Sequence, residues 1–196
     1  MKTLCLGGSF NPIHHGHLIC ARAVMERAGY AQVMLIPTHQ PPHKPGHANL
    51  APAHDRLRMC QLAVERSATF TVDDIELKRT GPSYTIDTAA ELKTQRGWPE
   101  VHWLIGADML NYLPKWHRAA ELIHEVHFVV MARPGFEFEW ANLPPEFQHL
   151  RDRITEAPRI DISSTQIRER VRAGVSIDYL TPAPVVDYVY DNGLYR

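Results

Sequence analysis

Short apolar runs of strand length alternate with amphipathic stretches of helix length along this chain of 196 residues. We expect strands over residues 3–6, 33–36, 70–72, 101–105 and 126–131. Such apolar runs are typical of strands that are buried on both faces of a parallel sheet. Because strands that alternate with helices imply βαβ units, the chain is predicted to be an α/β protein with a Rossmann-like, doubly wound parallel sheet.

Helical spacing of apolar residues is found between and after these runs. Glycine follows four of the expected helices, at Gly29, Gly97, Gly174 and Gly193, where it marks the helix end. We expect Ser83 to cap the third helix, and either Ser163 or Ser164 to cap the fourth. The expected helices cover residues 17–28, 52–65, 85–95, 163–173 and 182–192.

The length fits a single domain over residues 1–196, with a helical C-terminal part from about residue 163 to residue 196. Two proline-containing stretches interrupt the pattern. Residues 38–50 are expected to form a loop, and residues 136–147 a surface loop or a short helix. In doubly wound sheets ligands bind beyond the carboxyl ends of the strands, so functional residues are sought in the loops that follow the strands.

Charge and cysteine content exclude several classes of protein. Lys and Arg number 21 and Asp and Glu 22, so the chain lacks the excess charge that binds nucleic acid or an anionic membrane in bulk. No apolar run approaches the roughly 18 residues of a membrane span, and the first run is too short for a signal peptide. The three cysteines lack CxxC spacing and are expected to be reduced. We therefore expect a cytoplasmic protein with neither nucleic acid nor membrane as a partner.

The loop after the first expected strand carries the strongest functional signal. Residues 7–17 read GGSFNPIHHGH, which matches neither a P-loop nor a dinucleotide fingerprint. Paired glycines let the backbone approach a ligand closely, and the start of the helix that follows favours anions. His14 and His17 in the pattern H-x-G-H can donate N–H groups to phosphate oxygens. The loop therefore predicts a phosphate-binding site.

This loop resembles the signature of the nucleotidyltransferase superfamily that shares the H-x-G-H motif. Residues 162–168, ISSTQIR, resemble the second motif of the same superfamily. Over essentially the whole chain the sequence is similar to the bacterial nicotinate mononucleotide adenylyltransferases. The similarity includes residues 42–44, 83–88, 106–108, 113–116 and 132–135.

The resemblance implies a reaction in NAD biosynthesis that joins nicotinate mononucleotide and ATP, giving nicotinate adenine dinucleotide and pyrophosphate. It also implies Mg²⁺, which would bridge the triphosphate oxygens and keep several waters, so no residue is assigned as a metal ligand. The expected partners are therefore these two small molecules. The sequence does not decide the oligomeric state, and a homo-oligomer is one alternative.

The implied reaction brings two anions together without a covalent enzyme intermediate. It calls for hydrogen-bond donors and cations that position the phosphates and stabilise the leaving pyrophosphate. The resemblance gives such catalytic roles to His14, His17, Lys44 and Arg168. It assigns ATP binding to Gly7, Gly8, Ser9, Phe10, His14, His17, Gly106, Asp108, Arg133, Ser163, Ser164, Thr165 and Arg168. It assigns nicotinate mononucleotide binding to Ser9, Lys44, Ser83, Tyr84, Thr85, Asp108 and Trp116.

Several of these residues also have a purely structural interpretation. Asp108 and Ser164 could cap helices, Trp116 could belong to the core, and Arg168 could form a surface ion pair. The chain departs from the usual family pattern at Asn11, where Asp is usual. It departs again at His117, where Tyr often follows the tryptophan.

Three other functions are alternatives to this reading. His39, His43 and His47 are spaced by four, which on a helix would place them on one metal-binding face. The prolines among them exclude a helix. A zinc site in a loop, in a non-enzymatic metal-binding protein, therefore stays an alternative. Enzymes that transfer AMP to phosphopantetheine, or CMP to a small alcohol phosphate, resemble this chain in the first loop. They are not expected to match residues 83–88 or 106–116. Class I aminoacyl-tRNA synthetases have a similar motif, but the chain is short and lacks a basic surface for tRNA.

Overall fold

The computed structural model describes residues 2–42 and 49–196. Within these residues the chain forms a six-stranded parallel sheet in the order β3-β2-β1-β4-β5-β6. The strands are β1 (Thr3–Gly8), β2 (Gln32–Pro37), β3 (Phe70–Val72), β4 (His102–Gly106), β5 (His127–Ala132) and β6 (Ile154–Glu156). This order confirms the doubly wound α/β fold, because the chain runs outward from β1 to one edge and then from β4 to the other.

The helices occupy the connections between the strands and the C-terminal segment. They are α1 (His15–Arg27), α2 (Ala53–Val64), α3 (Thr85–Arg96), the short α4 (Ala107–Leu110), α5 (Ala119–Glu125), α6 (Ser164–Arg172) and α7 (Ala183–Asp191). Four 3₁₀ segments are found in the described part: Ile75–Lys78, Leu113–Lys115, Trp140–Asn142 and Pro145–Arg153. None of the described helices is long and apolar enough to cross a membrane.

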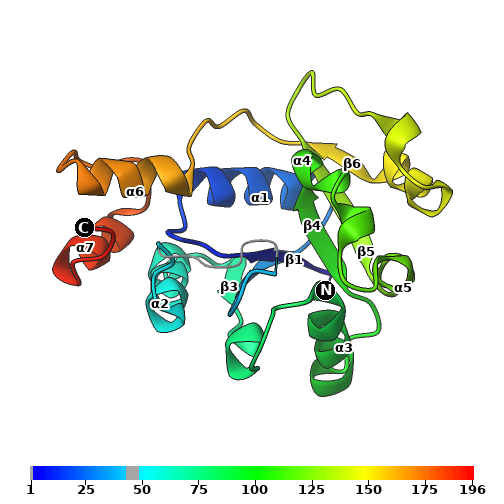
Figure 1. The fold of residues 1–196 in the computed structure, drawn as a ribbon, viewed down its shortest axis with the longest axis horizontal. Coiled ribbons are helices and arrows are strands. Elements are labelled where there is room, and N and C mark those ends of the chain that lie inside the picture. Colours follow the sequence, from blue (N-terminus) through cyan, green and yellow to red (C-terminus); the bar gives the residue numbers. More distant parts are fainter. Residues whose placement is uncertain (1, 43–48) are drawn as a thin grey trace.

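On the four central strands, β2, β1, β4 and β5, neighbouring residues pack into opposite halves of the core. Leu4 packs with α1, α2, α6 and α7, whereas Cys5 packs with α3 and α5. Leu104 and Trp103 divide in the same way on β4. Because side chains alternate across a strand, a sheet covered by helices on both faces needs apolar residues at successive positions. Figure 1 shows α1 and α3 on opposite sides of the sheet.

The structure corrects the expected cap of α3. Tyr84 is the N-cap residue, and the Ser83 hydroxyl instead accepts a hydrogen bond from the His39 backbone N–H at 2.9 Å. Ser163 does cap α6, since its hydroxyl accepts from the Gln166 backbone N–H at 3.1 Å. Ser83 therefore joins α3 to the loop after β2.

Two segments differ from their expected form. The strand β6 is not predicted by periodicity, because a run of three residues is too short to show a pattern. Residues 136–147 contain a short 3₁₀ helix, as one alternative predicts, but Leu143 and Phe147 within them are buried in the core around α5. The three cysteines are free and buried.

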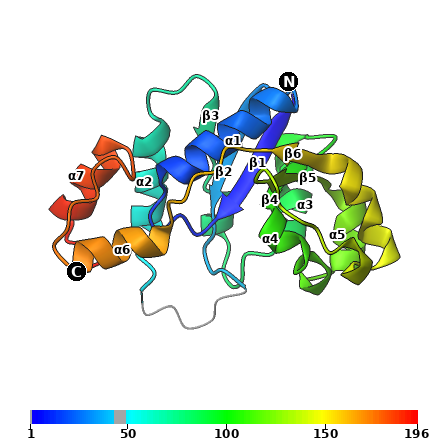
Figure 2. The ribbon, with the colours of Figure 1, turned by 90° about the horizontal axis from the view of Figure 1, so that it is seen from above.

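The helical C-terminal segment packs against the loop between β1 and α1. The Thr181 hydroxyl donates to the Ile13 carbonyl at 2.7 Å, and the Ser164 hydroxyl donates to the Pro12 carbonyl at 2.8 Å. Figure 2 shows α6 and α7 at the side of the molecule where α2 lies. The C-terminal segment therefore meets the loop between β1 and α1 at the carboxyl end of β1.

Candidate active site

Two cavities open at the carboxyl ends of β1 and β4, where the strand order reverses. We call them the α3-side cavity, of about 270 Å³, and the α1-side cavity, of about 410 Å³. Leu6, Leu104 and Gly106 line both of them. In a doubly wound sheet this switch point is where ligands bind. The adjacent cavities can therefore hold two ligands, or two parts of one ligand.

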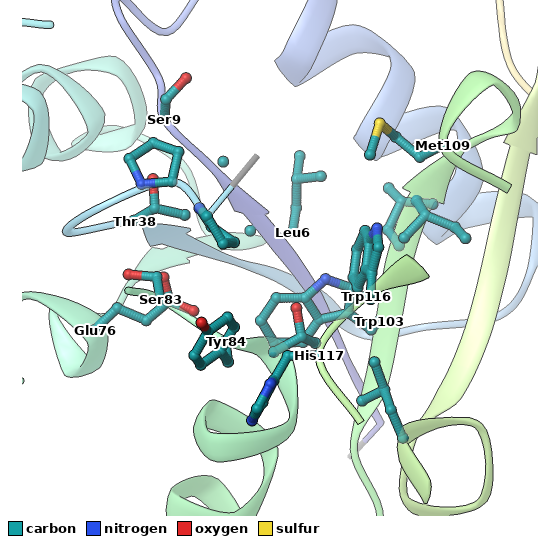
Figure 3. Close-up of a pocket in the computed structure, with 18 of the residues that line it drawn as sticks. Leu6, Ser9, Thr38, Glu76, Ser83, Tyr84, Trp103, Met109, Trp116 and His117 are labelled. Atoms are coloured by element: carbon teal, nitrogen blue, oxygen red, sulfur yellow. The ribbon is translucent and has the colours of Figure 1, made fainter. Parts of the chain in front are cut away.

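Aromatic side chains form much of the α3-side cavity. Trp103, Trp116, Tyr84 and His117 line it, and the last two rings stack with centroids 4.0 Å apart. Trp116 is half-buried and meets Phe128 edge to face. Figure 3 shows the two tryptophans on one side of the cavity and Glu76 and Ser83 on the other. The cavity thus offers flat apolar faces to a planar ring.

The N-terminus of α3 faces the same cavity. Ser83, Tyr84 and Thr85 line it, and the N-cap Tyr84 provides no capping side chain. The first backbone N–H groups of a helix have no carbonyl partner within it and attract anions. The start of α3 therefore provides backbone donors for an anion bound in this cavity.

Glu76 is a polar residue of this cavity that the sequence analysis did not single out. It is 2% exposed, and one carboxyl oxygen accepts from the Thr88 hydroxyl at 2.7 Å. The other oxygen has no hydrogen-bond partner in the described part of the chain. Burial raises the pKa of Glu76, although Thr88, Ser83 and Arg79 oppose that rise. Nothing in the local sequence distinguishes this glutamate from the neighbouring Asp73 and Asp74.

The α1-side cavity is lined by the H-x-G-H loop and by the ends of β4 and β5. His14, His17, Asp108 and Arg133 give it polar character, and Met131 and Ile160 are among its apolar residues. Arg133 is exposed and pairs with Asp161 at 2.9 Å. The mixture of an apolar wall with donors and a cation suits a nucleotide.

His14 and His17 form a stacked pair at the start of α1. Their ring centroids lie 3.7 Å apart with an interplanar angle of 27°. The His17 Nδ1 accepts a hydrogen bond from the His14 backbone N–H at 3.3 Å, so the neutral His17 ring carries its proton on Nε2. The His14 Nδ1 is buried without a hydrogen-bond partner among the described residues. Both rings thus keep unused hydrogen-bonding capacity at the cavity.

Burial keeps both imidazoles uncharged over the physiological pH range. It lowers the pKa of His14 to about 4 and that of His17 to about 3, and each ring is further disfavoured as a cation by a neighbouring histidine. Gly16 permits this packing, since a Cβ atom there would lie 3.0 Å from the His14 Nδ1. A phosphate would meet neutral N–H donors rather than two fixed positive charges.

The two motifs at opposite ends of the sequence are in contact. One Arg168 Nη donates to the Asn11 carbonyl at 2.9 Å, and the other lies 3.2 Å from the Thr165 hydroxyl. Within residues 2–42 and 49–196, no acidic side chain forms an ion pair with Arg168. Because Ser164 donates to the Pro12 carbonyl, its hydroxyl acts as a link between the motifs rather than as a helix cap.

Arg56 is a second residue that the sequence analysis missed. It is 1% exposed and donates to the backbone carbonyls of Ser9, Thr38, His39 and Ala51 at 2.7–3.3 Å. These carbonyls belong to the loop after β1, the loop after β2 and the segment before α2. Its role depends on the tertiary fold, so no local pattern could have indicated it.

The structure distributes the predicted site residues between the two cavities and the contact between the motifs. The α3-side cavity contains Gly7, Gly8, Ser9, Ser83, Tyr84, Thr85, Gly106 and Trp116. The α1-side cavity contains His14, His17, Gly106, Asp108 and Arg133. Ser163, Ser164, Thr165 and Arg168 line neither cavity and flank the H-x-G-H loop through the contacts given above. Lys44 lies outside the described residues.

Gly7 and Phe10 of the first loop pack against aromatic side chains. Gly7 is required by packing, since a Cβ atom there would lie 2.5 Å from the Trp103 ring. Phe10 is 2% exposed, and its ring meets His17 edge to face at 5.3 Å. The Phe10 side chain therefore supports the His17 ring from the core. ATP binding by Phe10 stays a prediction, and it would involve the backbone of Phe10 because the side chain is buried.

The zinc alternative receives no support from the described residues. Over residues 2–42 and 49–196, no group of three His, Cys, Asp or Glu side chains is placed to hold a metal ion. His43 and His47 lie outside this part of the chain, so only His39 of the three spaced histidines can be located.

Comparisons with known proteins agree with the geometry. A model of the cytidylyltransferase-like family matches residues 5–170. A probable nicotinate-nucleotide adenylyltransferase of Geobacillus kaustophilus is 43% identical over 194 residues, covering 99% of this chain and 86% of the relative. The nicotinate-nucleotide adenylyltransferase of Bacillus subtilis is 39% identical over 195 residues, covering 100% of this chain and 98% of the relative.

A solved structure shares the fold. The nicotinic acid mononucleotide adenylyltransferase of Plasmodium falciparum, complexed with NaAD, superimposes with a TM-score of 0.74 at 18% identity. The match covers 100% of this chain and 98% of that one. A second structure of the same protein, complexed with APC, has a TM-score of 0.74 at 17% identity.

Proposed function

This chain belongs to the cytidylyltransferase-like family and, within it, to the nicotinate-nucleotide adenylyltransferases, and from that membership we propose which cavity takes which substrate. The reaction transfers the adenylyl group of ATP to nicotinate mononucleotide, giving nicotinate adenine dinucleotide and pyrophosphate, in NAD biosynthesis. ATP occupies the α1-side cavity, and nicotinate mononucleotide occupies the α3-side cavity.

One observation carries this proposal: the two cavities share Gly106 and Leu6 at the switch point of the sheet. Substrates bound in adjacent cavities would bring their phosphates together beside the H-x-G-H loop. A phosphate oxygen of the mononucleotide then attacks the α-phosphorus of ATP in line, and the bond from that phosphorus to the bridging oxygen of pyrophosphate breaks. Positioning and charge stabilisation supply most of the catalysis.

On the ATP side, His14 and His17 would donate N–H groups to the phosphates. The neutral His17 ring carries its proton on Nε2, so this nitrogen can donate to a phosphate oxygen. Arg168 would bind the β- and γ-phosphates, with Ser163 and Thr165 at the same helix start. Lys44, from the loop after β2, would add a further positive charge.

On the mononucleotide side, the Trp116 ring would stack on the pyridine ring. Donors at the start of α3, around Thr85, would bind the nicotinate carboxylate. A carboxamide brings its own N–H donors and no charge, so the same site would bind nicotinamide mononucleotide less well. His117 stacks on Tyr84, which keeps an aromatic residue at a position where the family often has Tyr.

Mg²⁺ enters the proposal as the ion that accompanies ATP. It binds phosphate oxygens and retains several waters, so it needs few protein ligands. The donors around the α1-side cavity are mainly nitrogen groups, which suit phosphate oxygens better than they suit Mg²⁺. The ion would therefore be held by the triphosphate and its waters, where it neutralises charge on the leaving pyrophosphate.

We further propose a single domain over residues 1–196 that works in the cytoplasm, as a homo-oligomer or alone. The contacts of Thr181 and Ser164 with the first loop support the single domain, because the C-terminal helices complete the site rather than form a unit of their own.

The test is a pyrophosphate-release assay with ATP and Mg²⁺. Nicotinate mononucleotide, nicotinamide mononucleotide and phosphopantetheine are supplied in separate reactions. We expect release with the nicotinate compound and much less with the other two. Absence of release with both pyridine mononucleotides overturns the proposed reaction, whereas a preference for the amide overturns only the carboxylate-binding role of the α3 N-terminus.

A further inference from the structure

Asn11 is the centre of a buried hydrogen-bond network beside the H-x-G-H loop. It is 6% exposed, and its side-chain oxygen accepts from the Ala51 backbone N–H at 3.0 Å and from the Tyr195 hydroxyl at 2.8 Å. Its side-chain amide donates to the Asn49 carbonyl at 2.8 Å. Its own carbonyl accepts from Arg168 at 2.9 Å. Three other segments therefore meet Asn11: the residues before α2, helix α6 and the C-terminal tail.

The amide group of Asn11 suits this network better than the aspartate that is usual at this position. A carboxylate could accept from Tyr195 and Ala51, but it has no donor for the Asn49 carbonyl. The Asn49 side chain in turn accepts from Arg172 of α6 at 2.9 Å. The departure from the family pattern thus has a physical reason in the packing of α6 against the first loop.

Tyr195 belongs to this network, although no sequence argument singles it out. Burial raises the pKa of its phenol, so the hydroxyl stays protonated and remains a donor. Arg168 and Arg56 lie near enough to oppose that rise. The Leu194 backbone N–H donates to the Val189 carbonyl at 3.0 Å, which ties the last residues to α7. The C-terminal tail therefore brings one fixed donor to the phosphate loop.

We propose that Tyr195 is a positioning residue for ATP: its hydroxyl holds Asn11, and the Asn11 carbonyl holds the Arg168 guanidinium beside the H-x-G-H loop. Tyr195 touches no reacting atom in this scheme and acts through Asn11. The inference rests on the proposed function, because it needs Arg168 to bind the triphosphate. Loss of the hydroxyl would let Arg168 sample orientations that do not bind phosphate, so ATP binding would weaken.

The experiment compares Tyr195→Phe with a matched control, Tyr188→Phe. The Tyr188 hydroxyl donates to Asp55 at 2.8 Å and joins α7 to α2, and among the described residues it forms no hydrogen bond with the first loop. Both variants lose one partly buried tyrosine hydroxyl bond from the C-terminal segment. ATP affinity is measured by titration calorimetry with Mg²⁺, KM is measured for each substrate, and Tm is measured for each variant.

Tyr195→Phe is expected to weaken ATP binding and raise the KM for ATP about three- to ten-fold, the size expected for loss of one hydrogen bond. Its KM for nicotinate mononucleotide should stay within about two-fold of the wild type, since the α3-side cavity is untouched. Tyr188→Phe should lower Tm by a similar amount and leave both KM values unchanged. This split separates positioning from mere structural support.

Two results would overturn the inference. One is an unchanged ATP affinity in Tyr195→Phe at a temperature well below its Tm. The other is an equal loss of ATP affinity in Tyr188→Phe. If the wild type binds ATP but releases no pyrophosphate, the proposed reaction fails, and the calorimetric comparison still decides the role of Tyr195.

Discussion

Replacement of Arg56 by Met gives a sharp test of how the candidate site is held together. Methionine fills a similar volume but has no N–H donors. The carbonyls of Ser9, Thr38, His39 and Ala51 would then lose the guanidinium as a partner. The loops after β1 and β2, which border the α3-side cavity, would be released from each other and from the segment before α2.

The structure sets the expected size of the effect. A buried carbonyl left without its partner costs about 1–3 kcal/mol, and relief of the buried charge offsets part of the total. Taking about 1 kcal/mol net for each carbonyl, Arg56→Met should lower the free energy of unfolding by about 4 kcal/mol. For a domain of this size each kcal/mol lowers Tm by about 2–4 °C, so a loss of about 8–16 °C is expected.

Urea unfolding followed by circular dichroism measures this change, with Arg58→Met as the control. Arg58 is exposed on the same helix, so its replacement should alter the unfolding free energy by no more than about 0.5 kcal/mol. A loss below about 1 kcal/mol for Arg56→Met would refute the reasoning, because it would mean that the four carbonyls find other partners at little cost.

Three further predictions concern the two cavities. His17→Ala should keep the fold by circular dichroism but lower kcat about 10²-fold or more, since a transition-state donor is lost; a near-normal kcat would contradict the role of the motif. The free energy of unfolding should be highest above about pH 6.5 and fall as the pH drops toward about 4 and 3, because unfolded imidazoles take up protons that His14 and His17 reject in the native state. Urea titrations of His14→Gln should show a shallower slope over that range, and an unchanged slope would contradict the burial argument. Trp116→Ala should raise the KM for nicotinate mononucleotide about ten-fold with little change in the KM for ATP, and equal changes in both would argue against ring stacking.

The fold class could be predicted because it depends on local periodicity. The runs that became β1, β2, β4 and β5 are apolar at successive positions, and a strand buried on both faces needs that pattern. The strand β6 could not be predicted, because three residues are too few to show an apolar pattern. Ser83 was expected to be a cap from its local context, but a long-range bond to His39 uses its hydroxyl instead.

The candidate site, too, could be predicted only in part from the sequence. His14 and His17 could be named from sequence, since a motif followed by a helix start already implies phosphate chemistry. The stacking of the two rings, and the burial that keeps them neutral, follow only from the packed structure.

The alternating α/β pattern and the two motifs that point to nucleotide chemistry can be read from the sequence, because both consist of neighbouring residues. Which polar groups meet depends instead on how the chain packs. Arg168 reaches the Asn11 carbonyl across 157 positions, and Tyr195 reaches its side chain across 184. A buried polar group must find a hydrogen-bond partner wherever the fold provides one, and that partner is set by packing rather than by distance along the chain.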